Sequence, residues 1–204
     1  MKNLRALWLL FAANSVSGAS QGILMIAVPW YVTAQLGRPG LFGSLYMGIT
    51  VVSLFWGLYA GALVDRYDRR KIFLTCSAVG MLVSGTMAGV GFAEGDSLQA
   101  MPLWAAGVAF ATTIFIFNIH YPNLYAFGQE ITEPKNYGRI TSYLEVQGQL
   151  TNAFAGAIGA LLLEGFSVPG LRIGGWSWDP GWTVEPWPLH HILLLDAGTY
   201  GLSG

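Results

Sequence analysis

Long stretches without charge constrain the fold of this chain more than any other feature of its sequence. The hydrocarbon core of a bilayer is roughly 30 Å thick, and a helix needs about 20 apolar residues to cross it. Five segments meet this length, and a shorter sixth segment reaches Gly204. The predicted spans cover residues 6–36, 41–64, 72–92, 101–127 and 140–163, with a partial sixth span at 189–204. We therefore expect an all-α integral membrane protein with five full spans and a truncated sixth.

The composition agrees with a membrane location. Hydrophobic residues make up 53% of the chain and charged residues only 10%, whereas a soluble domain has about 25% charged residues. A net charge of -1, with no basic face, argues against a nucleic-acid partner. We expect the lipid bilayer and a small-molecule substrate as partners.

Polar or turn-forming segments separate the predicted spans. Residues 37–40 read GRPG, a typical tight turn, and residues 93–102 and 129–139 are polar. The longest connection, residues 164–188, is rich in Gly, Pro and Trp. Tryptophan is enriched at membrane interfaces, so we expect an extracytoplasmic loop that lies along the membrane surface.

The first 21 residues allow two interpretations. Lys2 and Arg5 precede an apolar stretch and small residues near Ala19, as in a cleaved signal peptide. Apolar sequence resumes at Gly22, which favours a continuous membrane span. We adopt the span and keep cleavage as the alternative.

The basic residues predict the orientation, because lysine and arginine collect on the cytoplasmic side of a membrane. If the amino terminus is inside, eight basic residues fall on the cytoplasmic side and two fall outside. The eight are Lys2, Arg5, Arg66, Arg69, Arg70, Lys71, Lys135 and Arg139, and the two are Arg38 and Arg172. We therefore expect a cytoplasmic amino terminus, in a plasma membrane of the bacterial type.

The connection between the second and third predicted spans concentrates charge. Residues 61–73 read GALVDRYDRRKIF and hold six of the chain's 10 basic and 11 acidic residues. This loop resembles the signature of the major facilitator superfamily, Gly-x-Leu-x-Asp-Arg-x-Gly-Arg-Arg/Lys-Arg/Lys. Asp68 stands where that family usually has glycine. The matching residues are Gly61, Asp65, Arg66, Arg69, Arg70 and Lys71.

The resemblance implies the amino-terminal six-helix bundle of a transporter built from two such bundles, which rock around a central cavity. It implies that the matching residues latch the bundles together on the cytoplasmic side. The simpler alternative is that the loop only fixes topology. The tract from HYPNLYAFGQEITEP to LLLDAGTYGLS is similar to the drug-efflux and siderophore-export branch, which implies secondary active efflux of small amphipathic compounds.

The partner that the resemblance implies is a missing or separate carboxyl-terminal six-helix bundle. The alternative function is a non-transporting membrane remnant, or a half-transporter that assembles with a separate second half. In this chain the predicted amino-terminal bundle extends over residues 1–204.

Polar residues inside the spans are candidates for a cavity, because intramembrane polar groups usually face a bundle interior or water. Each could instead serve helix packing through a hydrogen bond. Glu145 could pair with Arg139 or bind a proton or cation, and Asp196 has the same ambiguity. The candidates are Asn14, Gln21, Asn118, His120, Glu145, Gln149 and Asn152.

The sequence lacks two motifs that would indicate a membrane-embedded enzyme. It contains no HExxH and no P-loop pattern. His190 and His191 are adjacent, so they do not share a helix face as a pair four residues apart would. We expect a protein that is not an enzyme, with no catalytic residues, no metal site and no cofactor beyond proton or cation coupling.

Overall fold

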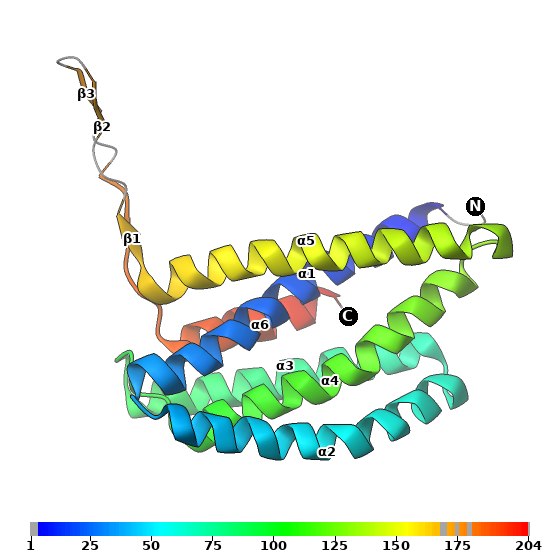
Figure 1. Ribbon diagram of the computed structural model, residues 1–204, viewed down its shortest axis with the longest axis horizontal. Coiled ribbons are helices and arrows are strands. Elements are labelled where there is room, and N and C mark those ends of the chain that lie inside the picture. The colour runs from blue at the N-terminus through cyan, green and yellow to red at the C-terminus, as the bar shows by residue number, and fades with distance from the viewer. Residues whose placement is uncertain (1–3, 168–170, 174–175, 179–180, 204) are drawn as a thin grey trace.

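Six α-helices form the body of the molecule (Figure 1). The computed structural model describes residues 4–167, 171–173, 176–178 and 181–203. The helices are α1 (Leu4–Trp30), α2 (Pro39–Arg66), α3 (Arg69–Glu94), α4 (Leu103–Glu130), α5 (Tyr137–Glu164) and α6 (Leu189–Ser203). A π-helix, η1 (Tyr31–Gln35), extends α1, and a 3₁₀ turn, η2 (Pro134–Asn136), precedes α5.

Four helices are long and apolar enough to cross a membrane within the described part of the chain. They cover Trp8–Gln35, Pro39–Arg66, Arg69–Glu94 and Leu103–Glu130, and they coincide with the first four predicted spans. The chain therefore has an all-α membrane fold. The prediction of five full spans is not confirmed: α5 has 28 residues but carries Glu145, Gln147 and Gln149 in its first half, which lower its apolar character.

The connection between α5 and α6 contains four short strands, which the sequence did not predict. β1 (Phe166–Ser167) pairs antiparallel with β4 (Thr183–Val184), and β2 (Leu171–Ile173) pairs antiparallel with β3 (Trp176–Trp178). These ribbons project from the end of the bundle where α1 turns into α2 (Figure 1). Part of the predicted interfacial loop, and the last residue of the predicted sixth span, lie outside the described residues.

The core lies between α1, α4 and α6. Leu24 and Val28 of α1, Phe110 of α4, and Ile192 and Leu193 of α6 are buried in one apolar cluster. α1 contacts α4, α5 and α6, whereas α2 packs mainly on α4. α1 and α4 are therefore central, and α2 and α5 flank them.

A row of small residues on α3 packs against α6. These residues recur every three or four positions, so they share one helix face. An added Cβ at Gly80 would lie 2.5 Å from the Tyr200 ring of α6, which means that only glycine fits this contact without movement. The buried row is Ser77, Gly80, Ser84, Ala88 and Gly91.

Candidate functional site

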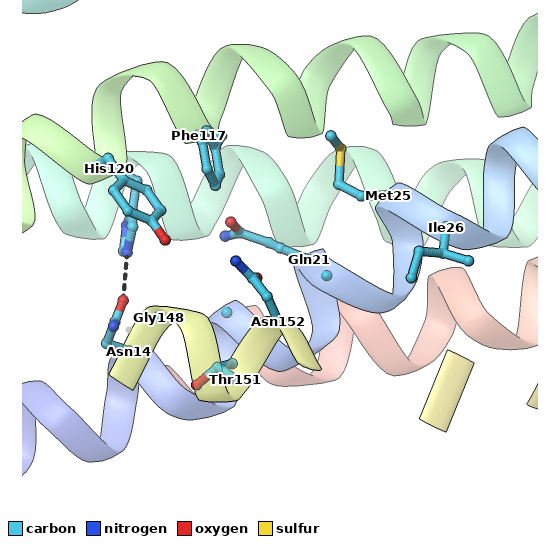
Figure 2. Close-up of a pocket in the computed structure, with 12 residues that line it drawn as sticks. Asn14, Gln21, Met25, Ile26, Phe117, His120, Gly148, Thr151 and Asn152 are labelled. Atoms are coloured by element: carbon cyan, nitrogen blue, oxygen red, sulfur yellow. Dashed lines mark hydrogen bonds between the residues drawn. The ribbon is translucent and has the colours of Figure 1, made fainter. Parts of the chain in front are cut away.

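A pocket of about 280 Å³ opens between α1, α4 and α5 (Figure 2). Helical spacing explains its wall, because residues three or four apart on α1 face the same side. The residues that line it are Asn14, Gly18, Gln21, Gly22, Met25 and Ile26 of α1, Phe117, His120 and Tyr121 of α4, and Gly148, Thr151 and Asn152 of α5.

A buried polar pair closes one end of the pocket. His120 Nε2 lies 3.2 Å from Asn14 Oδ1, and both side chains are buried. The imidazole also packs on the ring of Phe73, with 5.4 Å between ring centroids. The hydrogen bond joins α4 to α1 (Figure 2), so a substrate that used either group would have to compete with this bond.

The rest of the wall is largely apolar. Phe117 and Tyr121 lie side by side with ring centroids 4.4 Å apart, and Met25 and Ile26 of α1 line the same pocket. Small-molecule sites commonly combine such apolar and aromatic surfaces with a few placed polar groups. This lining can accommodate an amphipathic molecule.

The seven predicted cavity residues divide into two groups. Asn14, Gln21, His120 and Asn152 line the pocket. Glu145 and Gln149 are exposed on α5 outside it, and half-buried Asn118 does not line it. The residues that the sequence analysis missed are mostly apolar or glycine, and only their spacing from Asn14, Gln21 and His120 could have identified them. These residues are Gly18, Gly22, Met25, Ile26, Phe117, Tyr121, Gly148 and Thr151.

Glu145 does not pair with Arg139 in this structure. Its carboxylate accepts hydrogen bonds from the Tyr125 hydroxyl and, at 3.3 Å, from Gln149 Nε2. Arg139 instead donates to the Tyr143 hydroxyl at 2.8 Å. Glu145 lies eight residues into α5 from Tyr137, about 12 Å at 1.5 Å per residue. If this exposed face met lipid, a carboxylate at this depth would be energetically unfavourable.

Asp196 forms a second buried polar group, between α1, α3 and α6. Its Oδ1 accepts a hydrogen bond from Ser20 at 2.7 Å, and its Oδ2 accepts one from Ser84 at 2.7 Å. The residue is fully buried, and no salt bridge to it occurs among the described residues. Hydroxyl donors satisfy both carboxyl oxygens, so this carboxyl joins three helices without a cationic partner.

Asp68 caps α3 in the charged loop. Its Oδ1 accepts a hydrogen bond from the backbone N–H of Lys71 at 3.1 Å, which satisfies one free donor of the first helical turn. The residue that departs from the family pattern therefore has a local structural role.

Arg69 ties the start of α3 to the end of α4. Its guanidinium lies 2.5 Å from Glu130 and donates to the Ala126 carbonyl at 3.2 Å. Asn123 also donates to the Arg69 carbonyl, at 3.0 Å. Arg69 is thus engaged within this bundle.

The other residues of the loop face outward. Asp65, Arg66, Arg70 and Lys71 are exposed. An added Cβ at Gly61 would meet no described atom within 4 Å, so the surface of α2 is open at this glycine. The structure thus brings Arg69 into the bundle and leaves the remaining predicted latch residues on its surface.

Comparison with known proteins identifies the class. The family described as Major Facilitator Superfamily matches residues 10–179. The chain belongs to the major facilitator superfamily and is an integral membrane protein of a transporter family. Searches of curated proteins and of solved structures each return no match.

Proposed function

We propose that this chain forms a substrate-binding bundle of a secondary active transporter that exports small amphipathic compounds. The observation that carries the proposal is the pocket between α1, α4 and α5, which combines aromatic and apolar walls with the amides of Gln21 and Asn152. Its volume of about 280 Å³ is close to the lower end of small-molecule sites, about 300 Å³. The pocket therefore has room for a small ligand, or it forms one wall of a larger site.

We also propose that the amino terminus and the α2–α3 loop lie in the cytoplasm of a cell with a bacterial-type plasma membrane. The support is the distribution of basic residues, because four of them lie where α2 ends and α3 begins, at the same end of the bundle as the amino terminus (Figure 1). These are Arg66, Arg69, Arg70 and Lys71. The ribbons between α5 and α6 would then lie on the outer side.

A paired substitution tests the pocket. Phe117→Ala removes an aromatic wall of the pocket, whereas Phe154→Ala removes an exposed ring of α5 that does not line it. Burial of a phenylalanine side chain is worth about 1.5–3 kcal/mol, so we expect Phe117→Ala to weaken binding about tenfold or more. The measurement is fluorescence polarisation of an amphipathic dye titrated with purified protein.

Phe154→Ala should leave the affinity for the dye within about twofold of the unsubstituted protein, because Phe154 lines a separate apolar groove between α1 and α5 and not this pocket. Equal weakening by both substitutions would mean that the dye also binds outside the pocket, in that groove or on the general apolar surface. Unchanged binding by Phe117→Ala would show that the pocket is not the site.

A second candidate function is a half-transporter that assembles with a separate second bundle. The observation that favours it is the polar face of α5, where Glu145 is exposed and hydrogen-bonded only to Tyr125 and Gln149 in the described contacts. Such a face is unfavourable against lipid and favourable against a water-filled cavity between two bundles. The exposed residues of the α2–α3 loop would then latch against the second bundle.

A further inference from the structure

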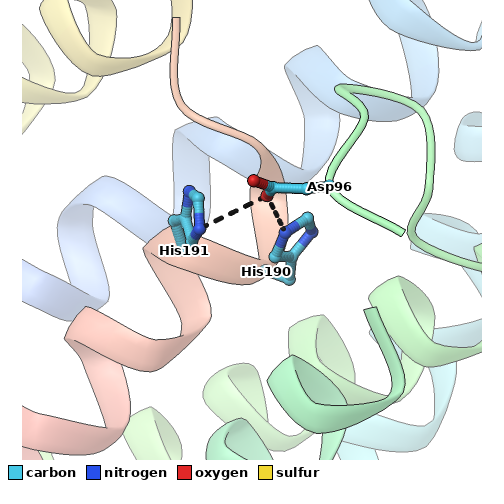
Figure 3. Close-up of side chains that lie close together, drawn as sticks. All are labelled: Asp96, His190 and His191. Atoms are coloured by element: carbon cyan, nitrogen blue, oxygen red, sulfur yellow. Dashed lines mark hydrogen bonds and ion pairs between the residues drawn. The ribbon is translucent and has the colours of Figure 1, made fainter. Parts of the chain in front are cut away.

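Three metal-ligating side chains meet at the end of the bundle opposite the α2–α3 loop. Asp96 belongs to the α3–α4 connection, and His190 and His191 lie in the first turn of α6. Asp96 Oδ1 is 3.1 Å from His190 Nε2 and 3.5 Å from His191 Nε2. Figure 3 shows the carboxylate between the two imidazoles.

The spacing fits a shared metal ion. One ligand atom from each of the three residues lies within 4.8 Å of the others. In a tetrahedral zinc site with bonds of about 2.0–2.1 Å, neighbouring ligand atoms are about 3.3 Å apart. The two distances from Asp96 Oδ1 lie on either side of that value, and the two imidazole nitrogens lie within 4.8 Å of each other, a limit longer than that value. Adjacent histidines were not expected to form a site, but α6 begins here, and the loop brings a carboxylate to both rings.

The two imidazoles are held in place by their neighbours. The Phe92 ring packs edge-on against the His190 ring, with 4.5 Å between ring centroids. The Trp187 ring lies edge-on to the His191 ring, with 6.2 Å between ring centroids. Gly91 leaves room for the His190 side chain, since a Cβ added at Gly91 would collide with the His190 Cβ. Ligands whose rotamers are fixed by packing lose little freedom when they bind an ion.

The site is also accessible. The His190 side chain is fully buried, but His191 is 34% exposed and Asp96 is 73% exposed. An ion can therefore enter from the aqueous side past Asp96, and a fourth position stays open to water. Three protein ligands plus one open position is a known arrangement for Zn²⁺.

We propose that Asp96, His190 and His191 bind a divalent transition metal ion of the Zn²⁺ class. Two imidazole nitrogens and one carboxylate oxygen suit Zn²⁺, Ni²⁺, Co²⁺ or Cu²⁺, whereas Mg²⁺ and Ca²⁺ prefer ligand sets made of oxygen. The ion joins the α3–α4 loop to the start of α6. This inference stands independently of the proposed transport function.

Among the three side chains, Asp96 has the largest electrostatic effect on metal binding. The amino-terminal end of α6 carries the positive end of the helix dipole, which disfavours a cation. The carboxylate offsets this effect and is the only charged ligand of the three when the imidazoles are neutral. Removing the charge of Asp96 should therefore weaken binding more than a loss of surface charge nearby.

The test uses the full chain, purified in detergent with an affinity tag that contains no histidine. Co²⁺ binding is followed by visible absorption, and Zn²⁺ binding by competition with Co²⁺ and by calorimetry. The test variants are Asp96→Asn and His191→Gln, and the matched control is Glu94→Gln, an exposed acidic residue at the end of α3 outside the cluster. Circular dichroism checks that each variant retains its helices.

We expect one Zn²⁺ per chain, and no competition from Mg²⁺. Loss of a direct ligand should weaken binding at least as much as loss of a supporting residue, about 10–100-fold, and Glu94→Gln should stay within about twofold. The proposal is overturned if the unsubstituted chain shows no Co²⁺ absorption, or if Asp96→Asn and His191→Gln both bind as tightly as it does. Equal weakening by Glu94→Gln would also overturn it, because the cause would then be general surface charge.

Discussion

Asp68 shows how a single residue can depart from a family pattern and still support the local fold. Glycine at this position would allow a tight turn, whereas aspartate caps the next helix by accepting from the Lys71 N–H. Asp65, three residues earlier, is exposed. The two aspartates of one loop therefore face different surroundings, and their substitutions should separate a local role from a role between bundles.

We predict that Asp65→Asn lowers the transport rate of a complete transporter several-fold without affecting membrane insertion. Asp65 lies in the last turn of α2, and the latch would place it against the amino-terminal end of a helix of the second bundle. An anion at such an end is worth about 0.3–1 kcal/mol, and about 1 kcal/mol corresponds to a factor of about five. The measurement is dye export by vesicles that contain equal amounts of inserted protein.

Asp68→Asn is the matched control for this prediction. Asparagine caps helices about as well as aspartate, so the control changes the charge of the loop and keeps the cap. A transport rate that is unchanged in Asp65→Asn, or lowered equally in both variants, would exclude the latch role of Asp65.

At the scale of elements, the α3–α6 contact depends on small residues. Gly80 lies under the Tyr200 ring, and Gly89 of the same helix has no described atom within 4 Å of an added Cβ. Gly80 is therefore in a tight contact, whereas Gly89 has free space beside it, although both lie inside α3.

We predict that Gly80→Ala lowers the free energy of unfolding by about 1–3 kcal/mol, because the Tyr200 ring must move to admit the methyl group. Gly89→Ala should raise it by up to about 1 kcal/mol, because alanine favours helix more than glycine does. Thermal unfolding in detergent, followed by circular dichroism, measures both. A stability gain in Gly80→Ala like that in Gly89→Ala would contradict the tight contact.

The sequence predicted the elements better than their contacts. Hydropathy located the four long apolar helices, because a lipid-spanning segment needs a long run without charge. The fifth predicted span, which α5 occupies, is not confirmed, because polar residues interrupt its apolar run. The strands between α5 and α6 carry no alternating pattern long enough to predict them.

For the whole molecule, the polar face of α5 indicates that this bundle does not meet lipid on every side. Glu145 and Gln149 occupy that face, whereas Leu82 of α3 lies on an apolar surface and is 67% exposed. The first surface suits a cavity or a second bundle, and the second suits lipid.

We predict that a photo-crosslinking residue at position 149 forms protein adducts in native membranes, and that the same residue at position 82 forms few or none. The reason is that a second bundle would cover α5, whereas lipid would cover Leu82 of α3. The readout is gel mobility after irradiation. Adducts between chains would indicate a separate second bundle, and the absence of any protein adduct at position 149 would contradict this assembly.

The sequence by itself determined the membrane class, four of the spans and the charged loop, because hydropathy and charge are properties of local segments. Only the tertiary structure decided which polar residues share a pocket, and which histidines face Asp96. Asp196 is the clearest case, because Ser20 and Ser84 lie 176 and 112 positions away from it. Such contacts depend on how helices pack against one another, and no local pattern in the chain specifies that packing.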